Sequence, residues 1–160
     1  MVKNYTMESL VMIVKIKKLT ETAQIPKKNF ATDACFDIYA NIQSYRSDGE
    51  IIIGPHETVK IPTGFATNLP HGYFAAVFAR SGLATNQGLR PANCVAVIDE
   101  PYTGEWMVPL HNDSDKPRII QHGDRIAQFA LFPYYNVEFD EVNELDYTTR
   151  GTNGFGSSGV

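Results

Sequence analysis

The stretch from Asn93 to Trp106 holds the residues best suited to chemistry. The apolar run 95–98 ends on the carboxylate of Asp99, and a second apolar run begins where the stretch ends. Pro101 fixes its own φ and Gly104 tolerates positive φ, which favours a turn between the runs and predicts a β-hairpin. A backbone-lined slot with one carboxylate and one aromatic residue could bind a small planar molecule beside an acid–base group. An ordinary hairpin in which Asp99 only begins the turn explains the same residues.

Two other stretches carry residue types that bind phosphate. Arg80, Ser81 and Gly82 combine a guanidinium, a hydroxyl and an unobstructed backbone N–H. A surface arginine beside a helix-capping serine would look the same. The segment 150–160 combines Arg150 with glycines, serines and a single aromatic residue. Backbone N–H groups in such a run can surround phosphate oxygens, and a disordered tail is the plain alternative.

Three polar residues lie within apolar runs. Gln128 falls inside a strand-like stretch, where its amide could hydrogen-bond a ligand or simply face solvent. Asp37 and Asp99 are flanked by apolar residues, and a buried carboxylate needs a partner. Either acid could face Mg²⁺, which prefers oxygen ligands and retains several waters. For Asp37, a hydrogen-bonded acid at a strand end is an equal alternative.

Short β-strands must position these residues. Glycine or proline interrupts nearly every gap between apolar runs, and no long stretch shows a helical period. The predicted strands are 10–17, 34–40, 50–53, 57–61, 64–67, 73–79, 95–98, 106–110 and 124–132. A short helical turn or loop is expected over 80–90, and a strand or extended segment over 134–147. The pattern predicts an all-β fold, a distorted jelly-roll sandwich or barrel with a mobile glycine-rich C-terminal arm.

Length and charge narrow the class of protein. We expect one domain over 1–149, with 1–9 as an extension and 150–160 as a flexible arm. The net charge of −4 argues against a generally basic nucleic-acid surface. No apolar run reaches membrane length and no leader peptide is evident, so a cytoplasmic protein without a membrane partner is expected. Cys35 and Cys94 are expected to be free thiols, and the histidines show no zinc-ligand spacing.

Five stretches, taken in order, resemble the five motifs of the trimeric deoxyuridine triphosphatase (dUTPase) family. They are 34–40, 80–84, 93–106, 123–128 and 150–159. The resemblance implies Mg²⁺-dependent hydrolysis of dUTP to dUMP and pyrophosphate by water attack on the α-phosphorus. Such a reaction limits dUTP and supplies dUMP for thymidylate synthesis. It also implies a jelly-roll subunit and a homotrimer, in which the arm of one chain closes an active site formed by the others.

The resemblance also assigns roles to individual residues. Asp99 would be the general base that deprotonates the attacking water. Tyr102 would pack against the deoxyribose and exclude a 2′-hydroxyl. The uracil edge would be read by Asn93, Val97, Ile98 and Met107. The phosphates would be held by Arg80, Ser81, Gly82 and Gln128, and their far end by Arg150, Gly156 and Ser157. Phe155 would stack on the uracil, and Asp37 would reach Mg²⁺ through water.

Three positions depart from the family pattern. Pro101 stands where a second aspartate is usual, Ala96 where glycine is usual, and Asn153 replaces a tail glycine. A methyl group at position 96 could narrow the uracil slot. Two rival functions remain at this point. One is a dCTP deaminase or a bifunctional deaminase-diphosphatase of the same fold, and the other is a dUTPase-like protein that acts by binding a protein partner.

Overall fold

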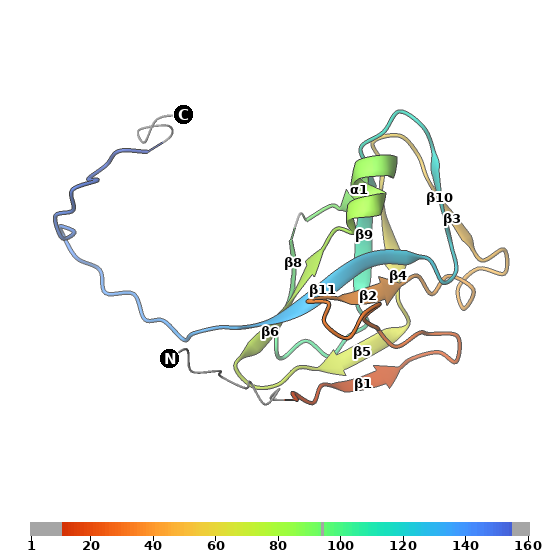
Figure 1. Ribbon diagram of the computed structural model, residues 1–160, viewed down its shortest axis with the longest axis horizontal. Helices are drawn as coiled ribbons and strands as arrows, with labels where there is room; N and C mark the ends of the chain where they lie inside the picture. Colours follow the sequence, from red (N-terminus) through yellow and green to blue (C-terminus); the bar gives the residue numbers. More distant parts are fainter. Residues whose placement is uncertain (1–10, 94, 155–160) are drawn as a thin grey trace, which may run out of the picture.

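In the computed structural model, which describes residues 11–93 and 95–154, nearly all regular structure is β (Figure 1). The single helix of these ranges is the short α1, Ser81–Gln87. The strands are β1 Lys15–Lys18, β2 Phe36–Tyr39, β3 Glu50–Ile53, β4 Thr58–Pro62, β5 Phe65–Asn68, β6 Tyr73–Phe78, β7 Leu89–Pro91, β8 Ala96–Ile98, β9 Met107–Asn112, β10 Arg118–Gln121 and β11 Arg125–Pro133. The all-β prediction is confirmed, as is the helical turn expected over 80–90.

The strands pair antiparallel in small sheets that enclose one apolar core. The largest sheet has the order β2-β11-β6-β8, a second has the order β4-β9-β7, and β1-β5 and β10-β3 form two-stranded sheets. Side chains alternate between core and solvent along β9, as a half-buried strand requires. At the centre, the Trp106 ring lies 5.2 Å from that of Phe65 and 5.0 Å from that of Phe129, centroid to centroid. This arrangement is an all-β fold of jelly-roll type.

The predicted β-hairpin around Asp99 is wrong. Its first strand, β8, pairs with β6, whereas its second strand, β9, pairs with β4 and β7 in another sheet. The connection 99–106 is too long for a tight turn, and it ends on Trp106, which is only 1% exposed. The backbone N–H of Trp106 donates to the backbone carbonyl of Phe65 at 3.0 Å. Burial of this indole in the core therefore carries the returning chain into a different sheet.

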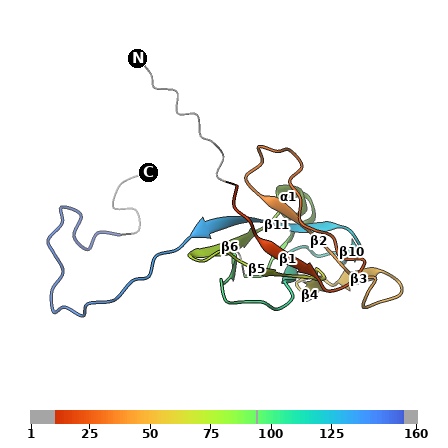
Figure 2. The same ribbon diagram turned by 90° about the horizontal axis from the view of Figure 1, so that it is seen from below.

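Both ends of the described chain differ from the bulk of the fold. The strand predicted over 10–17 is displaced, because β1 covers Lys15–Lys18 and all of its side chains are exposed. The segment 134–149 is extended without forming a strand, and its side chains are exposed. Figures 1 and 2 show it leaving the body beyond β11. No described residue after position 131 belongs to the core or packs against it, so this segment adds nothing to the apolar core.

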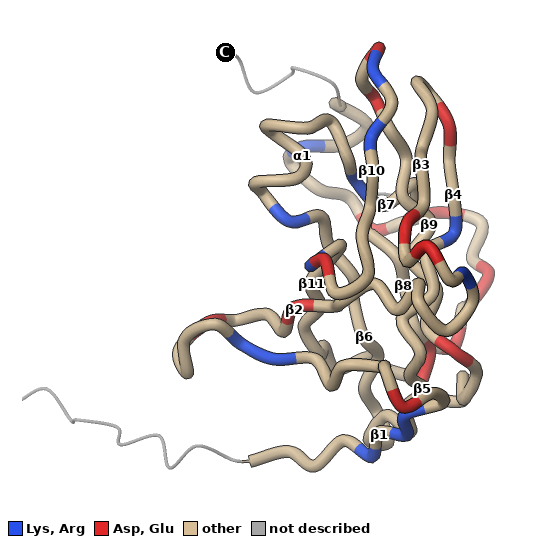
Figure 3. The backbone as a smooth tube through the Cα atoms, turned by 90° about the vertical axis from the view of Figure 1, so that its right-hand side faces the viewer, with Lys and Arg blue, Asp and Glu red and all other residues tan. Residues whose placement is uncertain are grey.

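Two short strands, β7 and β10, were not predicted. Each is short and paired on one side only, and each contributes one residue to the core, Leu89 from β7 and Ile120 from β10. Basic and acidic positions are interspersed along the chain in Figure 3. Within the described ranges, no helix combines the length and apolar character needed to span a membrane.

Candidate active site

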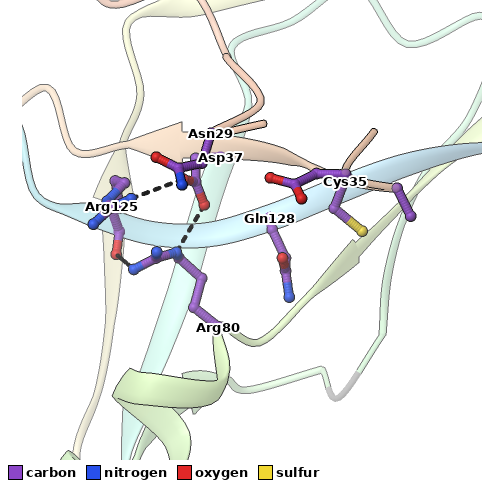
Figure 4. A pocket seen from close by; sticks show the side chains of 8 residues that line it. Asn29, Cys35, Asp37, Arg80, Arg125 and Gln128 are labelled. Carbon is purple, nitrogen blue, oxygen red and sulfur yellow. Dashed lines mark hydrogen bonds and ion pairs between the residues drawn. The ribbon is translucent and has the colours of Figure 1, made fainter. Parts of the chain in front are cut away.

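A polar cavity of about 360 Å³ opens where β2, β11 and the end of β6 meet (Figure 4). The pairing of the strands brings its lining residues together, because Gln128 on β11 lies opposite Asp37 on β2 and opposite Phe78 on β6. Arg80 follows Phe78 after one further residue. Three stretches predicted separately from the sequence therefore meet in one row. The cavity is lined by Asn29, Asp33, Ala34, Cys35, Asp37, Arg80, Arg125 and Gln128.

Two arginines converge on the carboxylate of Asp37. Arg80 Nε donates to one carboxylate oxygen at 2.7 Å, and Arg125 Nη1 donates to the other at 3.3 Å. Figure 4 shows both guanidinium groups directed at this acid. The Asp37 side chain is 12% exposed, so its carboxylate is largely shielded from water, whereas Arg125 remains 45% exposed. Each guanidinium has five N–H donors, and these contacts use few of them, which leaves donors for an anionic ligand.

Sequence reasoning placed Arg125 in a motif but not in the site. A register shift in the β11–β2 pairing falls between Arg125 and Ala127. Such a bulge re-aims the side chain at its position, and here it sends the guanidinium to Asp37. One signal in the sequence could have pointed to Arg125 as a site residue. It is a charged residue at the start of a strand that continues with mostly buried apolar residues.

The residues around Asp37 do not form a metal centre of their own. Both carboxylate oxygens already accept from arginines. No group of three His, Cys, Asp or Glu residues able to hold a metal occurs in the described part of the chain. A cation bound directly to Asp37 would share the carboxylate with two guanidinium groups, whose positive charge opposes it. The geometry fits a metal carried by the phosphates of a ligand better than one held by this acid.

The remaining predicted phosphate contacts lie beside this cavity. The N-cap of α1 is Arg80 and not Ser81, so the serine is not a helix cap. Ser81 is exposed at the first helical position, and a Cβ added to Gly82 would find nothing within 4 Å. The Gln128 amide nitrogen donates to the Ala79 carbonyl at 2.9 Å, which fixes its orientation and leaves its oxygen free to accept.

Cys35 lines the same cavity as a free thiol, as predicted. Burial raises the pKa of this thiol, and nearby Lys28 opposes the effect only in part. The thiol is therefore protonated at neutral pH and is a poor nucleophile. The expectation for Cys94 lies outside the described residues.

A second cavity, of about 410 Å³, lies beside the proposed base. Its lining residues are Phe74, Val97, Asp99, Glu100, Pro101 and Tyr134. Asp99 follows β8 directly and is exposed, and its carbonyl accepts the N–H of Tyr102 at 3.0 Å to form a turn. In the described part of the chain, no hydrogen bond or ion pair engages its carboxylate, which is thus available to a water molecule.

Tyr102 is held by a close contact with Gly104. The Tyr102 hydroxyl donates to the Glu105 carbonyl at 2.8 Å. A Cβ at position 104 would lie 2.6 Å from that hydroxyl oxygen and 2.7 Å from the adjacent ring carbon. Gly104 does not use the positive φ that glycine permits, since it is not among the positive-φ glycines of the described chain. The glycine is needed because the tyrosine ring occupies the space of a side chain.

The other predicted uracil contacts lie on either side of the connection 99–106. Ala96 is 8% exposed and its methyl group packs in the core, whereas Val97 is 54% exposed. The methyl group of Ala96, where the family usually has glycine, therefore fills the core and does not narrow a uracil slot. Ile98 is half-buried at the end of β8, and Met107 is 38% exposed at the start of β9. Asn93 is exposed in the turn after β7.

One chain does not bring the phosphate cavity and Asp99 together. Ile98 pairs with Ala75, which places Asp99 level with Phe74 at the beginning of β6. Arg80 lies beyond the other end of the same strand. At about 3.3 Å per residue, the stretch from Phe74 to Arg80 spans roughly 20 Å. Arg150 is farther away, on the exposed C-terminal part, where its Nε donates to the Asn153 carbonyl at 3.0 Å. Phe155, Gly156 and Ser157 lie outside the described residues.

Comparison with known proteins gives a consistent result. A family model described as dUTPase matches residues 21–159. The deoxyuridine 5'-triphosphate nucleotidohydrolase of Desulfitobacterium hafniense is 41% identical over 155 residues, covering 96% of this chain and 99% of its own. A mutant of the Staphylococcus bacteriophage 80alpha dUTPase, solved with dUpNHpp, superposes with a TM-score of 0.82 at 26% identity, covering 94% of this chain and 100% of its own.

A further solved structure, of a mutant dUTPase from phage phi11 of S. aureus, has the same fold. It superposes with a TM-score of 0.74 at 22% identity and covers 85% of this chain and 100% of its own. That structure is described as revealing the coordination of a structural Mg(II) ion.

Proposed function

Since this chain belongs to the dUTPase family and is a deoxyuridine triphosphate nucleotidohydrolase, we propose a route for its reaction. Water attacks the α-phosphorus of dUTP and releases dUMP and pyrophosphate. The reaction thereby limits dUTP and supplies dUMP for thymidylate synthesis. Identity of 41% across nearly the full length of a named dUTP nucleotidohydrolase favours this activity over a deaminase. One observation carries this route. The carboxylate of Asp99 is exposed beside a cavity and has no partner in the described chain, and it lies on a different element from the two arginines that converge on Asp37.

Asp99 is the proposed general base. Its carboxylate lines the second cavity, and no cation competes for it in the described part of the chain. A carboxylate within hydrogen-bond reach of the attacking water can accept its proton as the phosphorus–oxygen bond forms. The turn from Asp99 to Tyr102 holds the acid and the proposed sugar-packing ring close together in sequence and space. Proton acceptance and sugar selection therefore belong to one short connection.

Recognition of the sugar is assigned to the same connection, and recognition of the base to the residues on either side of it. Backbone groups near Asn93, Val97, Ile98 and Met107 read the uracil edge. Cytosine would present a donor where uracil presents an acceptor, and the mispaired polar groups would reject it strongly. Tyr102, seated on Gly104, occupies the place where a 2′-hydroxyl would project. The nucleotide selected is consequently a deoxyuridine nucleotide.

Arg80 and Arg125 bind the phosphates, with Ser81, Gly82 and Gln128 beside them. Their guanidinium donors face developing negative charge with little reorganisation, because Asp37 already holds them. Mg²⁺ bound to the phosphate oxygens of the substrate would add charge neutralisation. Asp37 would meet such an ion through water, because the positive charge of the two guanidinium groups beside its carboxylate opposes direct contact with a cation.

The active form is proposed to be a homotrimer with its active sites between subunits. The separation of roughly 20 Å along β6 supports this, because the base of one chain must meet the phosphate cavity of another. Residues 1–149 form the jelly-roll domain, and the arm 150–160 closes a neighbouring site. In that closure, Arg150, Gly156 and Ser157 grip the terminal phosphate, and Phe155 stacks on the uracil.

Pyrophosphate release should be measured with dUTP, dCTP, dTTP and UTP, each with Mg²⁺ and with a chelator. We expect release from dUTP alone at a high rate, and a large loss when Mg²⁺ is removed. Ammonia release from dCTP would contradict the assigned activity. Equal rates with dUTP and UTP would contradict the role of Tyr102.

A variant of Asp37 separates its two conceivable roles. Asp37→Asn should raise the KM for dUTP because the arginines lose their charged partner, while the Mg²⁺ concentration for half-maximal activity stays the same. Asp33→Asn is the matched control, since Asp33 lines the same cavity but accepts from the Phe30 N–H. A shifted Mg²⁺ requirement in Asp37→Asn alone would show that this acid binds the metal.

A further inference from the structure

Glu100, the residue after the proposed base, accepts three hydrogen bonds. The His71 ring Nδ1 lies 3.0 Å from one carboxylate oxygen. The Gly72 N–H and the Tyr134 hydroxyl donate to the other oxygen at 2.8 Å and 2.6 Å. The Glu100 side chain is 24% exposed. The family motifs identified in the sequence give this residue no role.

These donors come from two places that matter for the proposed reaction. His71 and Gly72 form the turn that precedes β6, the strand on which β8 pairs. Tyr134 is the first residue after β11 and begins the extended segment that carries the arm. The Tyr134 N–H also donates to the Gly72 carbonyl at 3.0 Å. The segment therefore leaves the body attached to one turn through its backbone and to Glu100 through its side chain.

The charge on Glu100 strengthens this attachment. The Tyr134 hydroxyl, then His71 and the Gly72 N–H, lower the pKa of Glu100 to about 2. The same hydrogen bond raises the pKa of Tyr134 above its ordinary value. Both groups thus keep the protonation states that this bond requires throughout the neutral range, and a hydrogen bond to a charged acceptor is stronger than a neutral one.

The opposite end of the connection has its own, separate attachment. Glu105 accepts from the Gly64 N–H at 2.7 Å and from the Tyr45 hydroxyl at 2.9 Å. Trp106 follows and is buried. Neither contact involves the C-terminal segment. Among the described contacts, only the end that carries Asp99 is attached to the start of that segment.

We propose that Glu100 is a positioning residue that fixes Asp99 and the start of the extended segment to the same turn. The position of Asp99 and the direction in which the chain leaves toward the closing arm are then fixed by the same contacts. The inference rests on the proposed function, in which Asp99 is the base and the arm closes a neighbouring site. It assigns a role in the reaction to Tyr134 and Glu100, neither of which touches the reacting atoms.

The test compares Tyr134→Phe, Glu100→Ala and Glu100→Gln in the full chain and in a chain ending at Thr149. The shortened chain keeps every core residue of the described structure. Tyr135→Phe is the matched control, because it is the same chemical change on the next residue, which is 85% exposed. Steady-state kcat and KM for dUTP are measured with the thermal midpoint of each variant.

In the full chain, Tyr134→Phe should lower kcat about threefold to tenfold, which matches the net contribution of one ordinary hydrogen bond, with KM changed less than about twofold. Glu100→Ala should lower kcat further, and Glu100→Gln should retain part of the rate because its amide oxygen still accepts. Tyr135→Phe should match the unaltered chain. In the shortened chain, Tyr134→Phe should cause no further loss, whereas Glu100→Ala should still reduce the residual rate.

Equal kcat values for Tyr134→Phe and Tyr135→Phe would overturn the inference. So would an equal loss from Tyr134→Phe in both chain lengths, because the effect would then not pass through the arm. Shortening the chain without any loss of rate is a different result. It would refute arm closure, and with it the proposed function of residues 150–160, whatever the single variants do.

Discussion

The phosphate cavity and the connection that carries Asp99 are built in opposite ways. In the cavity, Arg80 and Arg125 are already held by Asp37 within one chain. On the connection and the strand before it, the carboxylate of Asp99 and the side chain of Val97 are exposed, and both are available to a ligand or a second chain. The connection is instead anchored at its ends, through Glu100 and Trp106. A charge-binding site needs preorganised charges, whereas a base must keep its carboxylate free.

From this comparison we expect a substitution of Asp99 on the connection to have the largest effect on kcat, without loss of stability. Asp99→Asn should lower kcat by about 10²-fold to 10⁴-fold, the usual contribution of a positioned general base. Binding of a non-hydrolysable dUTP analogue and the thermal midpoint should change little, because the described contacts hold the backbone of this residue and not its carboxylate. Single-turnover rates and calorimetric binding measure the two effects. Normal turnover would remove Asp99 as the base.

The cavity should respond in both stability and substrate binding. Arg80→Ala removes the shorter contact to Asp37 and leaves a mostly buried carboxylate with one partner. We expect a loss of about 1–3 kcal/mol in the free energy of unfolding and a raised KM for dUTP. Arg125→Ala should cost less stability, since its contact is longer and its side chain is 45% exposed. Denaturant unfolding and steady-state kinetics should be measured for both variants. Equal losses of stability in Arg80→Ala and Arg125→Ala would contradict this prediction.

Sugar selection should be lost without loss of fold. Gly104→Ala places a methyl group where the Tyr102 ring lies, so the ring must move. The preference for dUTP over UTP, measured as the ratio of kcat/KM values, should fall about tenfold, a typical change for an altered pocket wall. Thr103→Ala is the control, because Thr103 is a neighbouring exposed residue. An unchanged ratio would show that Tyr102 does not read the sugar.

The smallest expected effect concerns pH and the anchor at Glu100. Because its pKa is lowered from 4.5 to about 2, ionised Glu100 stabilises the fold fully above pH 4.5 and loses this contribution as pH falls toward 2. The pKa of Tyr134 is raised, so the stability that its protonated hydroxyl contributes is present below pH 10 and is lost as pH rises above 10. The difference in thermal midpoint between the unaltered chain and Glu100→Gln should therefore shrink between pH 4.5 and 2. A constant difference would contradict this account.

Local pattern was sufficient for the strands and for most of the cavity. Alternating and β-branched runs placed β3, β5, β6 and β11 close to their positions in the structure. Residue chemistry selected Asp37, Arg80 and Gln128, which the structure brings into one cavity. The same reasoning missed Arg125, because its direction depends on a bulge in strand pairing. It also missed Glu100, whose donors come from residues far away along the chain.

The sequence by itself determined the residue types, their order and the all-β character, because these follow from side-chain chemistry and from periodicity along the chain. Only the tertiary structure decided that the runs on either side of Asp99 enter different sheets, since burial of Trp106 outweighs local turn preference. It also decided that Ala96 faces the core and that Gly104 makes room for a tyrosine ring. Contacts between distant residues and the packing of a shared core set such features, and neither is written in any short stretch of sequence.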